Sequence, residues 1–274
     1  MATDVEIREV AREVLLRLAI DKTPHVETPR TAKGDELLVR GSCGIDLVVF
    51  DLAGTTIRDD DATVLECFLG AAREANIRAD RGEMNAWMGA AKKQVFQHFS
   101  RRMGGDEATI EERAAKGYAA FQRNLEERYR TGPVEPLPGV ERCFERLKAC
   151  GIRVAASTGF YRRVVDILFS RLGWDRGIID ACVTSDEVPR GRPAPFMIFS
   201  AMTKLGIESV ARVAKVGDTP FDLHEGRNAG VGLNVGVLSG SHDALSLGRE
   251  AHAFLLASAA ELPELLNREH LLPR

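Results

Sequence analysis

A regular alternation of helical and strand-like segments between residues 140 and 237 constrains the fold of this chain more than any other feature. Apolar residues recur there first at helical spacing and then in short β-rich runs, with connections of only a few residues. We expect helices at 140–150, 162–172, 196–205 and 221–229, and strands at 153–157, 181–184, 213–216 and 232–237. Strands that alternate with helices in this way predict an α/β fold with a doubly wound parallel sheet.

A further strand and a helical insertion precede this region. The run at 45–50 is apolar and β-rich and ends abruptly at Asp51, as a buried parallel strand would. From about residue 63 to residue 130 the pattern is helical, with segments around 65–75, 84–103 and 111–129. This insertion predicts an α-helical cap.

The expected domains follow from these patterns. A core domain is expected at residues 44–60 and 132–274, a cap domain at 61–131, and an N-terminal helix with a linker at 1–43. The chain would cross between core and cap near 58–61 and 131–136, and we expect these crossings to act as hinges.

The composition is that of an ordinary globular protein, with 45% apolar residues, 28% charged residues and a net charge of -3. Nothing in it indicates a nucleic-acid surface, and no run approaches the roughly 20 apolar residues of a membrane span. The five cysteines are scattered and show no zinc-site spacing, which favours reduced thiols. We therefore expect a cytoplasmic protein with no nucleic-acid or membrane partner.

Polar groups follow three of the expected strands. Asp51 ends the first, Ser157, Thr158 and Gly159 end another, and Asp218 follows the strand at 213–216. Because active sites of such sheets lie at the carboxyl ends of the strands, we expect these groups to converge. Two carboxylates suit Mg²⁺, which prefers carboxylates together with substrate oxygens.

Phosphate could be bound at the same place. The backbone amides of Gly54 and Gly159, the nearby hydroxyls and Arg192 in the loop at 190–193 could take phosphate oxygens. Taken singly, Asp218 is more often a turn residue and Arg192 could be a surface ion-pair partner. The occurrence of all these groups in order predicts a phosphoryl-transfer site.

From Ile45 to the C-terminus, the residues resemble the haloacid dehalogenase superfamily, in its phosphonoacetaldehyde hydrolase (phosphonatase) branch. The motif Asp51-Leu52-Ala53-Gly54-Thr55 has alanine where most of the superfamily has a second aspartate, and this form is typical of that branch. The other matching motifs are Ser157-Thr158-Gly159, Gly191-Arg192-Pro193-Ala194-Pro195, Lys215-Val216-Gly217-Asp218-Thr219 with Asp222, and Met88-Gly89-Ala90-Ala91-Lys92 in the cap.

This resemblance implies a mechanism and a role for each matching residue. Asp51 would attack phosphorus and form an aspartyl-phosphate, and Lys92 would form a Schiff base with the substrate aldehyde. Thr158 and Arg192 would bind the phosphoryl oxygens. The Mg²⁺ ligands would be Asp51, the carbonyl of Ala53 and Asp218, with Asp222 orienting the metal shell. Substrate contacts are expected at Gly54, Thr55, Met88, Gly89, Ser157 and Gly159.

The chemistry of Lys92 can also be reconstructed from first principles. A carbon leaving group departs badly as a carbanion, whereas an iminium formed by lysine accepts the electrons and becomes an enamine. No oxygen leaving group then needs a proton from position 53, where this chain has Ala53. A nucleophilic lysine needs a lowered pKa, which a closed cap and a neighbouring cation such as Lys93 could supply.

Departures from the branch keep other functions open. Phosphonatases have a histidine three places beyond the cap lysine, where this chain has Val95, and His98 is a poor substitute. Several segments are closer to a phosphonatase-like sister group. The first alternative is a phosphatase acting on a small phosphorylated metabolite, with Lys92 gripping the substrate. The second is a non-catalytic sensor or a microcompartment-associated scaffold.

The N-terminal segment predicts an amphipathic helix. Apolar residues recur at helical spacing between 5 and 19, and Thr3 and Glu6 are spaced as a capping box. The helix could pack on its own core or on a second subunit in a homodimer. It also resembles the short peptides that recruit enzymes into bacterial microcompartments, so residues 4–19 could instead bind a shell.

Overall fold

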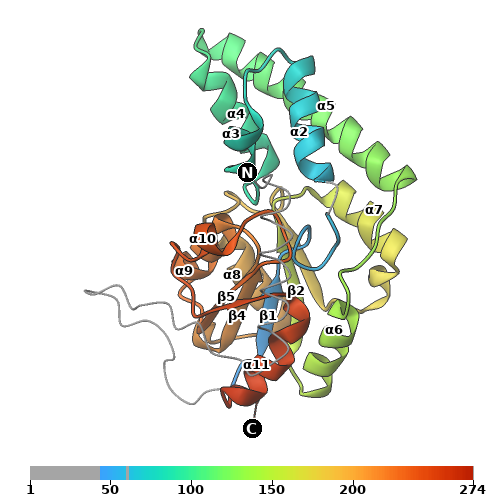
Figure 1. The fold of residues 1–274 in the computed structure, drawn as a ribbon, viewed down its shortest axis with the longest axis vertical. Helices are drawn as coiled ribbons and strands as arrows, with labels where there is room; N and C mark the ends of the chain where they lie inside the picture. Colours follow the sequence, from blue (N-terminus) through green and yellow to red (C-terminus); the bar gives the residue numbers. More distant parts are fainter. Residues whose placement is uncertain (1–43, 60–61, 274) are drawn as a thin grey trace, which may run out of the picture. The chain divides into compact units, whose positions relative to one another are not determined.

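The computed structural model describes residues 44–59 and 62–273. Six strands form one parallel sheet in the order β3-β2-β1-β4-β5-β6 (Figure 1). The strands are β1 (Leu47–Phe50), β2 (Arg153–Thr158), β3 (Ala181–Thr184), β4 (Val213–Gly217), β5 (Leu233–Val237) and β6 (Phe254–Leu256). The doubly wound parallel sheet expected from the alternating pattern is confirmed.

Helices cover both faces of this sheet because successive residues of a strand point to opposite sides. On β1, Val48 and Phe50 join the apolar core beneath α6 (Val140–Ala149), α7 (Arg162–Leu172) and α11 (Leu262–Arg268). Leu47 and Val49 join the core beneath α8 (Phe196–Leu205) and α9 (Pro220–Ala229). Shorter elements complete this part of the chain: η1 (Trp174–Arg176), η2 (Val210–Arg212), α10 (Ala244–Leu247) and η3 (Ala259–Glu261).

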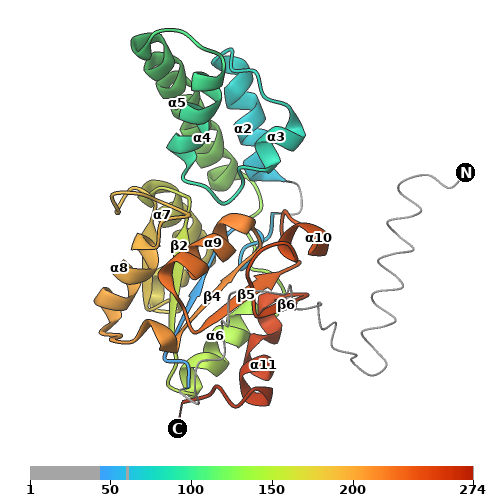
Figure 2. The same ribbon diagram turned by 90° about the vertical axis from the view of Figure 1, so that its left-hand side faces the viewer.

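Four helices are inserted between β1 and α6 and pack on one another (Figure 2). They are α2 (Thr63–Glu74), α3 (Arg81–Asn85), α4 (Lys92–Arg102) and α5 (Glu107–Thr131). Their core is aromatic: Phe68 stacks on Phe121 with ring centroids 4.4 Å apart, and Phe96 lies 5.8 Å from Phe121. Gly117 on α5 lets the Phe96 ring approach, because a Cβ there would lie 2.6 Å from it. We refer to these four helices as the cap.

The two chain crossings between β1 and α2 and between α5 and α6 run side by side. Ile57 forms an antiparallel bridge with Pro136, and the backbone N–H of Arg58 donates to the carbonyl of Glu135 at 3.0 Å. Hinge motion at these crossings stays a prediction, and residues 60–61 of the first lie outside the described chain.

The prediction of a helical segment over residues 84–103 is wrong. The structure has α3, then a turn at residues 86–91, then α4 beginning at Lys92. The break lies at Gly89, whose φ of +89° belongs to the left-handed region that a helix does not use. Met88 and Gly89 therefore lie in a turn. The short elements β6, α10 and α11 were not expected either, because three to seven residues carry little periodicity.

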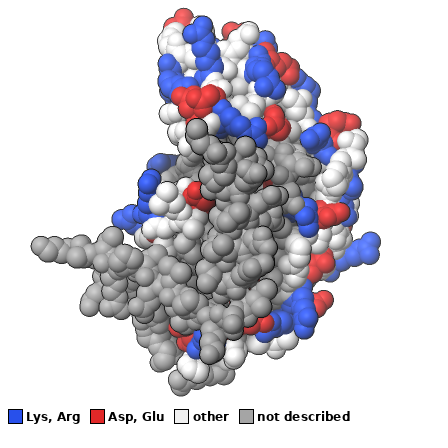
Figure 3. Space-filling model, in the orientation of Figure 1, with Lys and Arg blue, Asp and Glu red and all other residues white. Residues whose placement is uncertain are grey.

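Several other predictions stay untested. The N-terminal helix, the linker and the shell-binding segment at 4–19 all lie outside the described residues. Within the described residues, no helix has the length and hydropathy needed to cross a bilayer. On the face shown in Figure 3, the described Lys and Arg residues are interspersed with Asp and Glu. The cytoplasmic location and the homodimer stay predictions.

Candidate active site

The carboxyl ends of three neighbouring strands bring together the residues expected there. Asp51 follows β1, Thr158 ends β2 and Asp218 follows β4, and β1 pairs with both other strands. The connections from β1 and β4 leave in opposite directions from this point of the sheet, which is where such folds place their ligands. Thr56 fixes the backbone at Asp51 by donating from Oγ1 to the Asp51 carbonyl at 2.9 Å.

Three buried carboxylates form a candidate metal site. One oxygen from each of Asp51, Asp218 and Asp222 lies within 4.8 Å of the others. Asp218 is held in place by hydrogen bonds from Thr55 Oγ1 at 2.9 Å and from the Ser241 backbone at 2.8 Å. Burial, together with the charges of Asp51 and Asp222, raises the pKa of Asp218 to about 7. Hard oxygen ligands in this arrangement fit a divalent cation such as Mg²⁺.

Arg192 lies beneath these carboxylates. Its side chain is 0% exposed, and its guanidinium nitrogens lie 2.7 Å from Asp51, 2.9 Å from Asp222 and 3.0 Å from Glu225. Lys215 lies 2.8 Å from Asp222 and 3.3 Å from Glu225. Burial alone would raise the pKa of Asp222, but Arg192 and Lys215 outweigh it and hold this pKa below its usual value.

The position of Arg192 differs from the expected one. It was expected to bind phosphoryl oxygens from a loop, but it is absent from the described residues that line the cavity. Ser157 is also buried below the cavity, where its Oγ donates to Glu225 at 3.0 Å and its carbonyl accepts from Arg192. Arg192 thus contacts Asp51 from outside the cavity lining, and Ser157 contacts Arg192 and Glu225. Binding of phosphoryl oxygens by Arg192 and Ser157 stays a prediction.

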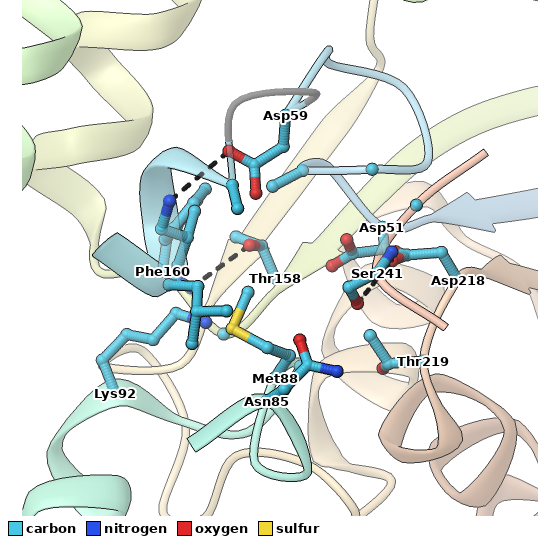
Figure 4. Close-up of a pocket in the computed structure, with 18 of the residues that line it drawn as sticks. Asp51, Asp59, Asn85, Met88, Lys92, Thr158, Phe160, Asp218, Thr219 and Ser241 are labelled. Atoms are coloured by element: carbon cyan, nitrogen blue, oxygen red, sulfur yellow. Dashed lines mark hydrogen bonds between the residues drawn. The ribbon is translucent and has the colours of Figure 1, made fainter. Parts of the chain in front are cut away.

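A cavity of about 520 Å³ lies between the strand ends and the cap. Figure 4 shows Asn85, Met88 and Lys92 on one side of it, and Asp51, Asp218 and Ser241 on another. Its lining is Asp51, Ala53, Gly54, Asp59, Ala62, Val64, Leu65, Arg81, Gly82, Asn85, Met88, Gly89, Lys92, Thr158, Gly159, Phe160, Asp218, Thr219, Ser239, Gly240 and Ser241. Of the expected site residues, Thr55, Ser157, Arg192 and Asp222 lie behind this lining.

Lys92 faces the cavity from the first turn of α4 (Figure 4). Its side chain is 5% exposed, and its Nζ lies 5.4 Å from the ring centroid of Phe68 and 5.2 Å from that of Phe160. Burial, with a smaller contribution from the charge of Arg192, lowers the pKa of Lys92 to about 8 against the opposing charge of Asp51. Lys93 was the cation expected to lower the pKa of Lys92, but its side chain is exposed. Arg192 is instead the cation whose charge lowers this pKa.

The turn before α4 is pressed against the loops of the core. A Cβ on Gly89 would lie 2.2 Å from Thr219 Oγ1, and a Cβ on Gly159 would lie 2.5 Å from the carbonyl of Ala90. A Cβ on Gly191 would meet Ala91 at 2.8 Å. Glycines at these contacts let the two backbones approach closely, and the cap is therefore closed over Asp51.

The residues beyond Lys92 on α4 carry no acid–base group into the cavity. Val95 is fully buried in the apolar core, and His98 is exposed and stacks on Trp87 at 4.1 Å. The sequence reasoning missed other cavity residues, above all Asp59 and Asn85. Neither belongs to a motif: Asp59 lies on the chain crossing after β1, and Asn85 is at the end of α3 in the cap.

A family model described as haloacid dehalogenase-like hydrolase matches residues 45–230, more than half of the chain. The chain belongs to the haloacid dehalogenase-like hydrolases. This family assignment makes it a hydrolase, and general phosphohydrolase activity fits the site described above.

Curated relatives within this family are named phosphonoacetaldehyde hydrolase. The Bacillus cereus protein is 31% identical over 214 residues, which are 73% of this chain and 78% of the relative. The Bacillus cytotoxicus protein is 28% identical over 83% of this chain and 88% of the relative. The Bacteroides fragilis protein is 39% identical over 128 residues, and this match spans only 47% of each chain.

Solved structures show the same fold at lower identity. A phosphonoacetaldehyde hydrolase-like protein from Oleispira antarctica has a TM-score of 0.71 at 20% identity, covering 88% of this chain and 98% of that one. A hydrolase from Pseudomonas syringae has a TM-score of 0.68 at 22% identity, covering 82% and 98%. At this identity the likeness supports the haloacid dehalogenase-like fold alone.

Proposed function

We propose that this hydrolase cleaves the C–P bond of phosphonoacetaldehyde or a closely related aldehyde phosphonate. The observation that carries the proposal is that Lys92, with its lowered pKa, lies in the same cavity as Asp51. A nucleophile for phosphorus and an amine for a carbonyl group in one closed cavity fit a substrate that has both groups. Relatives named phosphonoacetaldehyde hydrolase support the same substrate.

Asp51 is the proposed nucleophile. Arg192 contacts Asp51 Oδ1 at 2.7 Å, which leaves Oδ2 to attack phosphorus and form the aspartyl-phosphate. Thr158 also lines the cavity and would donate to a phosphoryl oxygen. Ala53 offers no proton to a leaving group, which fits a carbon leaving group better than an alcohol.

Mg²⁺ is the proposed cofactor. Asp51, the carbonyl of Ala53 and Asp218 would hold it, while Asp222 is anchored by two cations and would orient the site from below. A bound Mg²⁺ would neutralise charge on the phosphoryl oxygens during transfer. Adding Mg²⁺ should raise the melting temperature of the protein, and Asp218→Asn should abolish this rise while exposed Asp243→Asn keeps it.

Lys92 is the proposed Schiff-base residue. With a pKa of about 8, a useful fraction of this amine is neutral near neutral pH and can attack an aldehyde carbon. The iminium formed there accepts the electrons of the C–P bond as phosphorus moves to Asp51. The rings of Phe68 and Phe160 lie beside Nζ, and burial of this amine is the main cause of its lowered pKa.

The test is mass spectrometry after incubation with phosphonoacetaldehyde, Mg²⁺ and borohydride, together with assays for released phosphate and acetaldehyde. We expect a reduced adduct on Lys92 in the wild type and in Lys93→Met, and neither adduct nor turnover in Lys92→Met. Lys93 is a matched control because it is the neighbouring lysine but is exposed. Phosphate release from esters without any adduct would instead establish a phosphatase.

A further inference from the structure

We propose that Asp59 is the acid–base residue that moves protons while the adduct on Lys92 forms and breaks down. This inference rests on the proposed function, because it assigns a role within the Schiff-base steps. A lysine that forms an iminium needs a neighbouring group to take the ammonium proton and to protonate the departing hydroxyl. Neither Lys92 nor Asp51 can supply this proton transfer while acting as a nucleophile.

The cavity contains few groups that could do so. Among the described residues, the charged side chains in its lining are Asp51, Asp59, Arg81, Lys92 and Asp218. Asp51 attacks phosphorus, Asp218 belongs to the metal site, and a guanidinium such as that of Arg81 does not give up its proton in proteins. Asp59 is therefore the carboxylate in this lining to which no other role is assigned.

The surroundings of Lys92 also indicate that its proton carrier lies in the cavity. Phe68 and Phe160 cover its Nζ, and Val95, one turn further along α4, is buried and apolar. Protons must therefore reach Nζ from the cavity. Figure 4 shows the Asp59 carboxylate on the cavity wall above Thr158 and Phe160.

Asp59 is placed by the first chain crossing from the core to the cap. Its Oδ1 accepts a hydrogen bond of 3.4 Å from the backbone N–H of Val64 in the first turn of α2. Its charge raises the pKa of Lys92, as that of Asp51 does, which puts the carboxylate within electrostatic range of Nζ. Asp59 thus reaches the cavity from a segment outside every sequence motif of the site.

The proposed steps balance in atoms and charge. Asp59 takes a proton from the Lys92 ammonium, and the freed lone pair on Nζ forms a bond to the carbonyl carbon. A proton passes from this nitrogen to the new alkoxide, which gives a carbinolamine. Asp59 then returns its proton to the hydroxyl, which leaves as water while the nitrogen lone pair forms the C=N bond of the iminium.

After phosphoryl transfer, the C–P electrons form the C=C bond of an enamine on Lys92. Asp59, reprotonated from solvent, gives a proton to the terminal carbon and so regenerates an iminium, which water hydrolyses to acetaldehyde and the Lys92 ammonium. Hydrolysis of the aspartyl-phosphate returns one proton to solvent. Asp59 therefore supplies the proton in two steps, the departure of the hydroxyl and the protonation of the terminal carbon.

The test compares wild type with Asp59→Asn and Asp106→Asn. Asn at position 59 keeps an oxygen that can accept from Val64 but cannot take the ammonium proton. Asp106 is the matched control, because its side chain likewise accepts from a backbone N–H at the start of a cap helix but it lies outside the cavity lining. The measurements are the rate of borohydride-trapped adduct formation, phosphate release from phosphonoacetaldehyde, and inhibition by inorganic phosphate.

We expect Asp59→Asn to slow adduct formation and phosphate release by about 100-fold or more, since acid–base catalysis contributes on this order. Inhibition by inorganic phosphate should not change, whereas a purely structural defect would weaken it. Asp106→Asn should behave as wild type. If Asp59→Asn keeps rates within about threefold of wild type while the wild-type adduct forms, Asp59 is not the proton carrier. If the wild type forms no adduct, it is the proposed function that fails.

Discussion

Arg192 Nη2 lies 2.7 Å from Asp51 Oδ1, on the side of the carboxylate that faces away from the cavity. The same guanidinium contacts Asp222 and Glu225, and all of these side chains are buried. One cation thus links Asp51 to the two carboxylates behind it. Its loss would leave Asp51 without its buried counter-ion.

Replacement of Arg192 by alanine should destabilise the protein strongly. Removing one partner of a buried ion pair leaves uncompensated charge and costs about 3–5 kcal/mol. Urea unfolding would measure this loss. Arg192→Lys keeps the positive charge but lacks the planar guanidinium that contacts several carboxylates at once. Relative to Arg192→Ala, it should regain part of the stability and little of the activity.

A surface arginine provides the control for this prediction. Arg146 pairs with Glu264, and both side chains are largely exposed, so Arg146→Ala should cost less than about 1 kcal/mol. Equal losses for Arg146→Ala and Arg192→Ala would contradict the buried role of Arg192.

The pH dependence of the reaction should follow Lys92. Its lowered pKa of about 8 means that the amine is protonated below this pH and neutral above it. Because only the neutral amine attacks an aldehyde, kcat/KM for phosphonoacetaldehyde should rise with pH and level off above about 8. A profile that is flat between pH 6 and 9 would argue against Lys92 as the nucleophile for carbon.

Gly89→Ala should impair activity more than stability. The new Cβ would sit 2.2 Å from Thr219 Oγ1 on a backbone with a φ of +89°, so the turn that leads to Lys92 must move away from the core. A displacement of about 1 Å at a reacting group costs on the order of 100-fold in rate. We expect kcat/KM to fall by about this factor.

A substitution at Gly104 serves as a control that distinguishes the effect of backbone strain from the effect of this clash. Gly104 also has a positive φ, +75°, but a Cβ there would meet no atom within 4 Å. Gly104→Ala should therefore show only the cost of strain, about 1 kcal/mol of unfolding free energy, with normal kcat/KM. Similar activity in the two variants would mean that the contact with Thr219 is dispensable.

Asn85 should contribute to substrate binding. Asn85 is half-buried and lines the cavity, and its side-chain amide forms no hydrogen bond with another described residue (Figure 4). Asn85→Leu should raise KM about three- to tenfold, the value of a lost hydrogen bond, without lowering unfolding free energy. Steady-state kinetics and urea unfolding measure the two effects. An unchanged KM would show that the amide stays solvated when substrate is bound.

Residues at strand ends were predictable from the sequence because their place depends on the sheet alone. Asp51, Thr158 and Asp218 each follow a short apolar run, and parallel pairing brings the ends of such runs to one edge. The break at Gly89 was not predictable from periodicity, because it depends on how closely Thr219 approaches.

Buried charges were harder to predict. Lys215 lies in the middle of β4 and is fully buried, which is tolerable only because α9 supplies Asp222 and Glu225 on the same side. Arg192 meets the same group from a loop more than 20 residues earlier in the chain. Such a set of partners depends on packing between distant segments, and no local pattern reveals it.

The pairing of the two chain crossings limits how the cap can open. Because Ile57 bridges to Pro136 and Arg58 donates to the Glu135 carbonyl, the crossings form a short two-stranded strap. Two separate tethers would let the cap twist and slide, whereas a strap bends mainly about one axis. Opening would then be a rotation of the cap about one axis, and Lys92 would return to the same position over Asp51 at each closure.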